Sequence, residues 1–163
     1  MLLWFAGTAI VSVWFVFRDP GFDYRLLCLG ALLPDLVDVW FGGARAFHSL
    51  TVSIATLVAV VAASAGRKRW RKRALAVPIG MMLHLVFDGA FSNTRVFWWP
   101  IGGLHFRHDR LPSVARGWFD LVLEVLGAAM LVWVWRTFDL GSAQRRRQLV
   151  RDGSLGAPRP SRR

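Results

Sequence analysis

The chain is divided into long apolar segments by short polar breaks, and this pattern constrains its fold more than any other feature. Hydrophobic residues make up 55% of the sequence, above the roughly 45–50% of a soluble domain. Apolar helices of about 20 residues are the elements that cross a bilayer. The pattern predicts an all-α protein, a polytopic transmembrane bundle of four to five helices. Its apolar segments are 2–17, 24–41, 48–66, 74–91 and 118–135.

Basic residues gather in two clusters that flank apolar segments. Of the 21 Lys and Arg residues, six lie in 67–73 and eight in 136–163. Cytoplasmic loops of membrane proteins carry such an excess, and two predicted spans separate the clusters, so both can be cytoplasmic. This placement argues against nucleic acid as a partner in spite of the net charge of +11. Membrane lipids are the expected partners.

These assignments divide the chain into two parts and give it an orientation. Residues 1–136 form the predicted transmembrane domain, with a polar site in its outer half. Residues 137–163, rich in Arg, Gly, Ser and Pro, form a predicted disordered, basic cytoplasmic tail. Arginine outnumbers lysine 19 to 2, which is typical of a GC-rich bacterial genome. We therefore expect a multi-pass protein of the bacterial inner (plasma) membrane. The length of segment 24–41 fits a full span or a re-entrant helix.

Acidic and histidine residues interrupt the apolar segments at helical spacings. Asp35 and Asp38 are three residues apart, and His84 and Asp88 are four apart, so each pair shares one helix face. Both pairs lie roughly 15–21 Å from the inner ends of their segments, at a common depth. An aspartate at the centre of a span costs roughly 2.5–3.5 kcal/mol on insertion. These side chains are therefore expected to face one another, a cavity or a cation.

A mixed set of carboxylates and imidazoles predicts a divalent-metal site. Zinc is the first expectation, with manganese or iron as alternatives, because magnesium prefers oxygen ligands and water. A metal lowers the pKa of bound water, and a carboxylate off the metal can act as general base. Asp38 and Glu124 are the predicted catalytic residues, Glu124 by holding a ligand histidine in place. The predicted ligands are Asp35, Asp38, His48, His84 and Asp88.

Each of these residues also has a structural interpretation. The pair of aspartates could begin a helix, and the histidine–aspartate pair could hydrogen-bond two helices together. His48 and Ser49 could cap a helix start. Glu124 could pair with an arginine of the outer loop. His105 and His108 in that loop could bind metal, although a flexible loop more often leaves such residues solvated.

Four short motifs follow one another in a fixed order. They are Gly30-Ala-Leu-Leu-Pro-Asp35-Leu-Val-Asp38, His48-Ser49, His84-Leu-Val-Phe-Asp88 and Trp98-Trp99-Pro100. Together they resemble the YdjM-like family of inner-membrane proteins, described as metal-dependent hydrolases and as LexA-binding. The resemblance covers residues 29–100. Family members often carry a His-Arg-x-x-Thr-His-Ser box; here Gly43 replaces the first His and Phe47 the Thr.

The resemblance and the polar cluster give the functional expectation. We expect a membrane-embedded, metal-dependent hydrolase that cleaves a lipid-like ester, phosphoester or amide with water activated by the metal. Two alternatives come from other classes. One is an ion or proton pathway, because chains of acidic and histidine residues also relay protons across membranes. The other is a metal-stapled structural or partner-binding protein without turnover.

Overall fold

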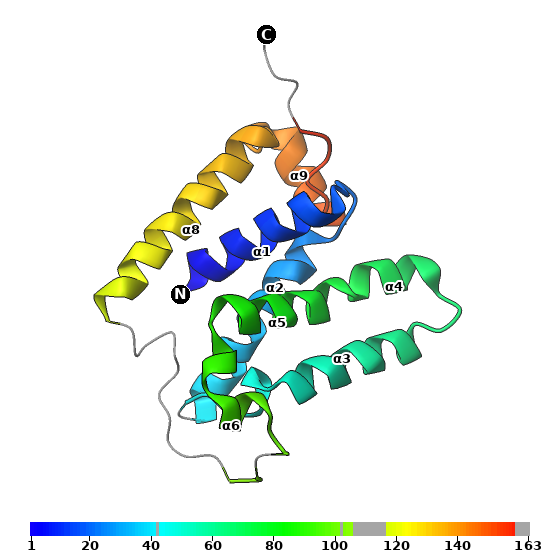
Figure 1. The fold of residues 1–163 in the computed structure, drawn as a ribbon. Helices are drawn as coiled ribbons and strands as arrows, with labels where there is room; N and C mark the ends of the chain where they lie inside the picture. The colour runs from blue at the N-terminus through cyan, green and yellow to red at the C-terminus, as the bar shows by residue number, and fades with distance from the viewer. Residues whose placement is uncertain (42, 102, 106–116, 159–163) are drawn as a thin grey trace.

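The computed structural model describes residues 1–41, 43–101, 103–105 and 117–158 (Figure 1). Every regular element in these ranges is a helix, which confirms the all-α prediction. Each of the five apolar segments corresponds to one of the principal helices. These are α1 (Leu2–Phe17), α2 (Tyr24–Asp38), α3 (Leu50–Ala63), α5 (Ala76–Phe87) and α8 (Trp118–Thr137).

Shorter helices occupy the connections between the principal ones. Single turns of 3-10 helix, η1 (Val39–Phe41) and η2 (Ala46–His48), join α2 to α3. The basic run that the sequence suggests is a loop forms α4 (Lys68–Ala74), in keeping with the good helix propensity of unbranched Arg and Lys side chains. The connection after α5 contains η3 (Ala90–Ser92) and α6 (Thr94–Phe97).

The predicted disordered tail is wrong for its central part, which forms α9 (Ala143–Asp152). The hydroxyl of Ser142 caps this helix by accepting a hydrogen bond from the Arg145 backbone N–H, and Gly153 ends it with a φ of 76°. Leu149 packs against the hydrophobic core of the bundle. The polar composition of the tail does not reveal this helix, because its two caps and the packing of Leu149 are sufficient to stabilise it.

The principal helices alternate in direction. In Figure 1, α1, α3 and α8 run one way and α2 and α5 run the other way. Helix α2 packs most extensively against α5, and α1 packs against both α8 and α2. The core between them is built from buried apolar side chains that include Phe5, Leu27 and Phe138. Helices α1 and α8, which are far apart in the sequence, therefore lie side by side.

The basic segments meet at one end of the bundle, which we call the basic end. Lys72 of α4 pairs with Asp19 of the α1–α2 turn at 2.7 Å, and the Tyr24 N–H donates to the Gly153 carbonyl beyond α9 at 2.8 Å. The hydrogen bond from Lys72 is the main cause that lowers the pKa of Asp19. Helix α4, helix α9 and the turn between α1 and α2 thus share one end.

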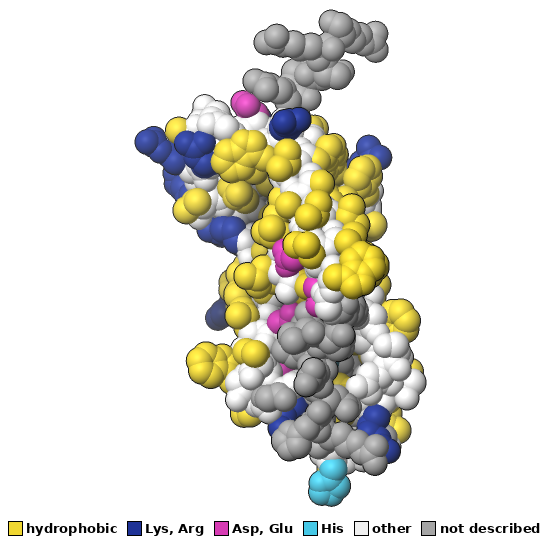
Figure 2. All heavy atoms as spheres, turned by 90° about the vertical axis from the view of Figure 1, so that its left-hand side faces the viewer, with side chains coloured by type: hydrophobic (Ala, Val, Ile, Leu, Met, Phe, Trp, Pro, Cys, Tyr) yellow, Lys and Arg dark blue, Asp and Glu magenta, His cyan; other side chains and the backbone are white. Residues whose placement is uncertain are grey.

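Apolar side chains cover much of the outer surface of the bundle. On α8, Leu121 and Val125 are 69% and 61% exposed, and Val58 of α3 is 61% exposed. Figure 2 shows hydrophobic side chains over much of the face on which α8 lies. Among the described residues, α8 alone is long and apolar enough to cross a bilayer; α1 and α3 are apolar but shorter.

Two glycines allow α2 and α5 to touch through their backbones. A Cβ at Gly30 would lie 2.1 Å from the Val77 carbonyl oxygen, and one at Gly80 would lie 2.3 Å from the Leu27 carbonyl oxygen. Only residues without a side chain fit such a contact. The close approach places the backbone of Ala31 directly against α5, where it contributes to the site.

Candidate metal centre

Three side chains from three elements bring one ligand atom each to a common point. They are Asp35 from α2, His48 from η2 and His84 from α5. Asp35 Oδ1 lies 3.3 Å from His48 Nε2 and 3.7 Å from His84 Nε2. The two Nε2 atoms are 3.4 Å apart. These three were among the five predicted ligands, and the structure brings them together.

The three distances suit a small divalent cation. A point about 2.0 Å from all three atoms exists at the centre of their triangle, while zinc binds imidazole nitrogen at about 2.0–2.1 Å and carboxylate oxygen at about 2.0–2.2 Å. Manganese and iron also accept this mixture of nitrogen and oxygen. The residues present therefore fit the predicted metal in both geometry and chemistry.

His84 is held by the backbone of the neighbouring helix. Its Nδ1 lies 2.7 Å from the Ala31 carbonyl oxygen, and because a carbonyl only accepts hydrogen bonds, Nδ1 carries the proton. The ring of Phe5 packs against the imidazole with centroids 4.1 Å apart. His84 is 1% exposed. Its Nε2 lone pair is thus directed at the common point.

His48 is held in the same way by a carboxylate. Its Nδ1 lies 2.7 Å from Asp38 Oδ2, which also accepts the Arg45 backbone N–H at 2.7 Å. The adjacent Ser49 caps α3 by accepting from the Val52 N–H at 3.2 Å, so the capping interpretation is confirmed for this residue. The cap starts α3 directly after His48 and thereby helps to fix the position of the ring.

These hydrogen bonds decide what the centre can bind. The Asp38 carboxylate accepts from Nδ1 of His48, and the Ala31 carbonyl accepts from Nδ1 of His84. The two Nε2 atoms and Asp35 Oδ1 then face one another as electron-rich groups. Their mutual repulsion is relieved either by a proton on His48 Nε2 shared with Asp35 or by a cation among the three atoms. Ligand histidines in metalloproteins commonly donate their second N–H to a carboxylate or carbonyl, as both do here.

The other predicted site residues have different places. Asp38 bonds the Nδ1 edge of His48, so it orients a ligand and is not one of the converging groups. Asp88 is fully buried at the C-cap of α5, but it too is outside the converging group. Asp35 and Asp38 contact opposite nitrogens of the same His48 ring, which agrees with the three-residue spacing that places them on one helix face.

Glu124 does not support a ligand histidine. Its Oε2 accepts the Leu3 backbone N–H at 3.0 Å, and its Oε1 lies 3.6 Å from the Met1 ammonium. A carboxylate is stabilising at the positive end of a helix, and Glu124 serves the start of α1 in this way. The position of Glu124 along α8 suggested that it could reach the site. Helix α8 packs on α1, however, and the Glu124 side chain therefore contacts the start of α1 instead.

One feature of the site lies beyond the sequence predictions. The Ala31 carbonyl was not anticipated, although Ala31 precedes Asp35 by one helical turn and so shares its face. His105 is exposed and is not part of the centre, while His108 lies outside the described residues.

Replacing Asp38 with alanine is expected to weaken metal binding by about 10–100-fold, because partners of ligand histidines typically contribute that much. Asp38→Asn should recover part of the affinity, since its amide oxygen can still accept from His48 Nδ1. Competition against a chromophoric chelator measures both variants. Exposed Asp152 offers a control, and Asp152→Ala should bind as the wild type does. Equal affinity for Asp38→Ala would show that Asp38 does not position the ligand.

Comparison of the chain with protein-family models, with curated proteins and with solved structures finds no match.

Proposed function

We propose that the protein is a membrane-embedded, metal-dependent hydrolase that cleaves a lipid-like ester, phosphoester or amide. The observation that carries the proposal is the convergence of Asp35, His48 and His84 on one point of metal-binding size. The motif resemblance to the YdjM-like family is part of the same proposal. Zinc is the first candidate for the ion.

The number of ligands favours catalysis over a purely structural metal. Structural zinc sites use four protein ligands, whereas catalytic sites use three and keep one position open. Three ligands converge here among the described residues. Asp35 keeps 16% of its side-chain surface exposed while both histidines are almost fully buried, so a substrate would approach from the side of Asp35. A metal held there would supply Lewis acidity and lower the pKa of water.

The residues of the chain would hold and orient this chemistry. Asp35, His48 and His84 would bind the metal, and Asp38 and the Ala31 carbonyl would fix the two rings. Tight packing around His84, including the ring of Phe5, would exclude bulk water from the buried side. Such preorganisation spares the site from rearranging during the reaction.

Several observations support the placement in a membrane. Exposed apolar side chains are numerous on α3 and α8, whereas monomeric soluble proteins rarely expose large apolar patches. The principal helices alternate in direction, and the basic helices α4 and α9 share one end, which would be cytoplasmic. Asp35 lies about 16 Å along α2 from Tyr24 at the basic end, which would put it in the outer half of a multi-pass bundle. A lipid-like substrate would reach that depth from the bilayer.

A proton pathway is the second candidate, and one observation favours it. Asp38, His48 and Asp35 form a continuous chain of close polar contacts within the protein. Such a chain could pass a proton by way of the His48 ring. Metal content separates the candidates, because a proton relay needs no bound ion.

Hydrolysis tests the leading proposal directly. Purified protein in detergent, given a panel of chromogenic lipid esters, phosphoesters and amides, should cleave one class. Chelation should abolish the activity, and added zinc, manganese or iron should restore it. Asp35→Asn should lower activity by at least about 100-fold, since a ligand contributes more than its outer partners. Full activity in the metal-free protein or in Asp35→Asn would refute a metal-dependent hydrolase at this centre.

A further inference from the structure

An apolar cavity of about 370 Å³ lies at the basic end, and Cys28 in its wall is roughly 10 Å along α2 from Asp35. Helices α1, α2, α8 and α9 form its walls through side chains such as Cys28, Leu131, Trp135 and Leu149. A volume of this size is within the range of ligand pockets, about 300–1,000 Å³. Trp135 is 49% exposed, so this wall also faces the surroundings of the bundle.

Arginines stand at the edge of this apolar cavity. Arg25 is the one charged residue among the described residues that line it. The Arg25 guanidinium pairs with Asp23 and donates to the Val150 carbonyl of α9. Arg146 donates to the carbonyls of Leu140 and Gly141, and Leu140 is itself a wall of the cavity. An apolar space with guanidinium groups at its edge matches a molecule with an apolar chain and an anionic head.

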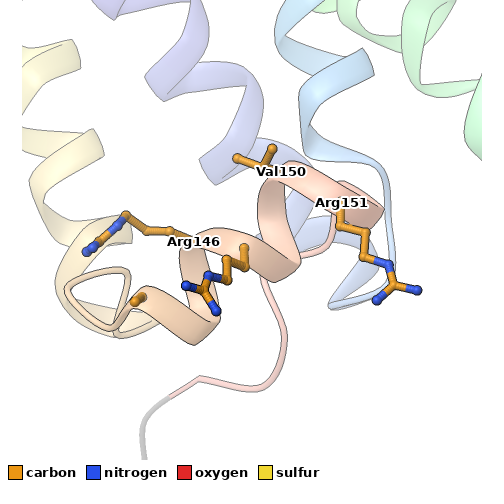
Figure 3. A pocket seen from close by; sticks show the side chains of 5 residues that line it. Arg146, Val150 and Arg151 are labelled. Carbon is orange, nitrogen blue, oxygen red and sulfur yellow. The ribbon is translucent and has the colours of Figure 1, made fainter.

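The exposed side of α9 extends this basic edge. Arg146, Arg147 and Arg151 lie with Val150 around a surface pocket (Figure 3), and Val150 is 72% exposed. Their spacing of one, four and five residues places them on one side of the helix. Leu149, which packs on the core, lies on a different side. Helix α9 therefore presents apolar surface to the cavity and positive charge to the outside.

We propose that the basic end binds one anionic phospholipid of the inner leaflet, with an acyl chain in the cavity under α9 and its phosphate against Arg146. The inference rests on the membrane placement proposed above, and it is independent of the metal centre. Each arginine near a membrane surface contributes roughly 1 kcal/mol toward anionic lipid, about a fivefold preference. The bound lipid would fasten α9 to α2 and α8 at the cytoplasmic surface.

Native mass spectrometry of the full chain in detergent, with added phosphatidylglycerol or phosphatidylcholine, tests the proposal. The wild type should retain one phosphatidylglycerol per chain at concentrations where phosphatidylcholine is not retained. Arg146→Gln should reduce that preference by about fivefold, the share of one arginine. Arg69→Gln on α4 removes the same charge at the same end but away from the cavity, so it should have no effect.

The chain's one cysteine gives a second readout that needs no variant. Cys28 lines the cavity, so phosphatidylglycerol should slow its alkylation by a small thiol reagent severalfold more than phosphatidylcholine does. Cys28→Phe, which fills the cavity, should abolish lipid retention without changing the surface charge. The proposal would be overturned if Arg146→Gln and Arg69→Gln weakened phosphatidylglycerol retention equally and the lipid did not slow the alkylation of Cys28. Retention would then depend only on the general positive charge of the surface. Displacement of the lipid by inorganic phosphate alone would overturn the acyl-chain site.

Discussion

Replacing His84 with alanine is expected to reduce bound metal from about one ion per chain to nearly none. His84 supplies one of only three converging ligand atoms among the described residues, and its loss leaves two. Removing a residue that only hydrogen-bonds a ligand histidine lowers metal affinity by about 10–100-fold, so removing the histidine itself should lower it further. The remaining His48 and Asp35 would still pair with each other at 3.3 Å, which keeps the fold while the ion is lost.

Inductively coupled plasma mass spectrometry measures this prediction. The protein should be purified in detergent without a histidine tag or chelator, since either would change the metal content. His105→Ala is the matched control, because His105 is exposed and lies outside the centre. It should keep the metal of the wild type. Circular dichroism should show that His84→Ala remains helical.

The opposite results separate the functional candidates. A folded wild type without metal would remove the hydrolase proposal and favour the proton relay through His48. Equal metal in wild type and His84→Ala would place the ion elsewhere in the chain. Loss in both His84→Ala and His105→Ala would indicate adventitious binding to imidazoles.

Hydrophobic patterning predicted the principal helices because each one corresponds to a long apolar stretch bounded by polar residues. The bounds of α1 coincide with the predicted segment 2–17, and α8 extends the segment 118–135 by two residues. Counting the rise per residue along the helices also anticipated that Asp35 and His84 could meet, and they lie 3.7 Å apart. These predictions depend on local chain properties alone.

Rotation and docking of the elements were not predictable in this way. Asp38 and Glu124 have suitable depth, but the η2 turn and the packing of α8 on α1 direct them to His48 Nδ1 and to the start of α1. Those directions depend on side-chain packing between segments distant in the sequence. Helix α9 was missed for a related reason, because the docking of Leu149 onto a distant core stabilises it.

Replacing Gly80 with alanine is expected to destabilise the bundle and empty the metal centre together. The new Cβ would lie 2.3 Å from the Leu27 carbonyl oxygen and 2.6 Å from the Ala31 nitrogen, so α2 and α5 must separate. Separation would break the 2.7 Å contact between the Ala31 carbonyl and His84 Nδ1, which orients that ligand.

The sign of this effect makes it a sharp test of the close helix contact. Within an unconstrained helix, Gly→Ala stabilises by about 0.8–1.0 kcal/mol, whereas overpacking a tight contact costs about 1–3 kcal/mol. Thermal unfolding in detergent should therefore show a lower midpoint for Gly80→Ala, with reduced metal content. Gly141→Ala is the control, because its nearest neighbour is Trp135 Nε1 at 3.9 Å, an ordinary contact. A raised midpoint with full metal content in Gly80→Ala would mean that α2 and α5 are farther apart, and the Ala31 carbonyl could then not orient His84.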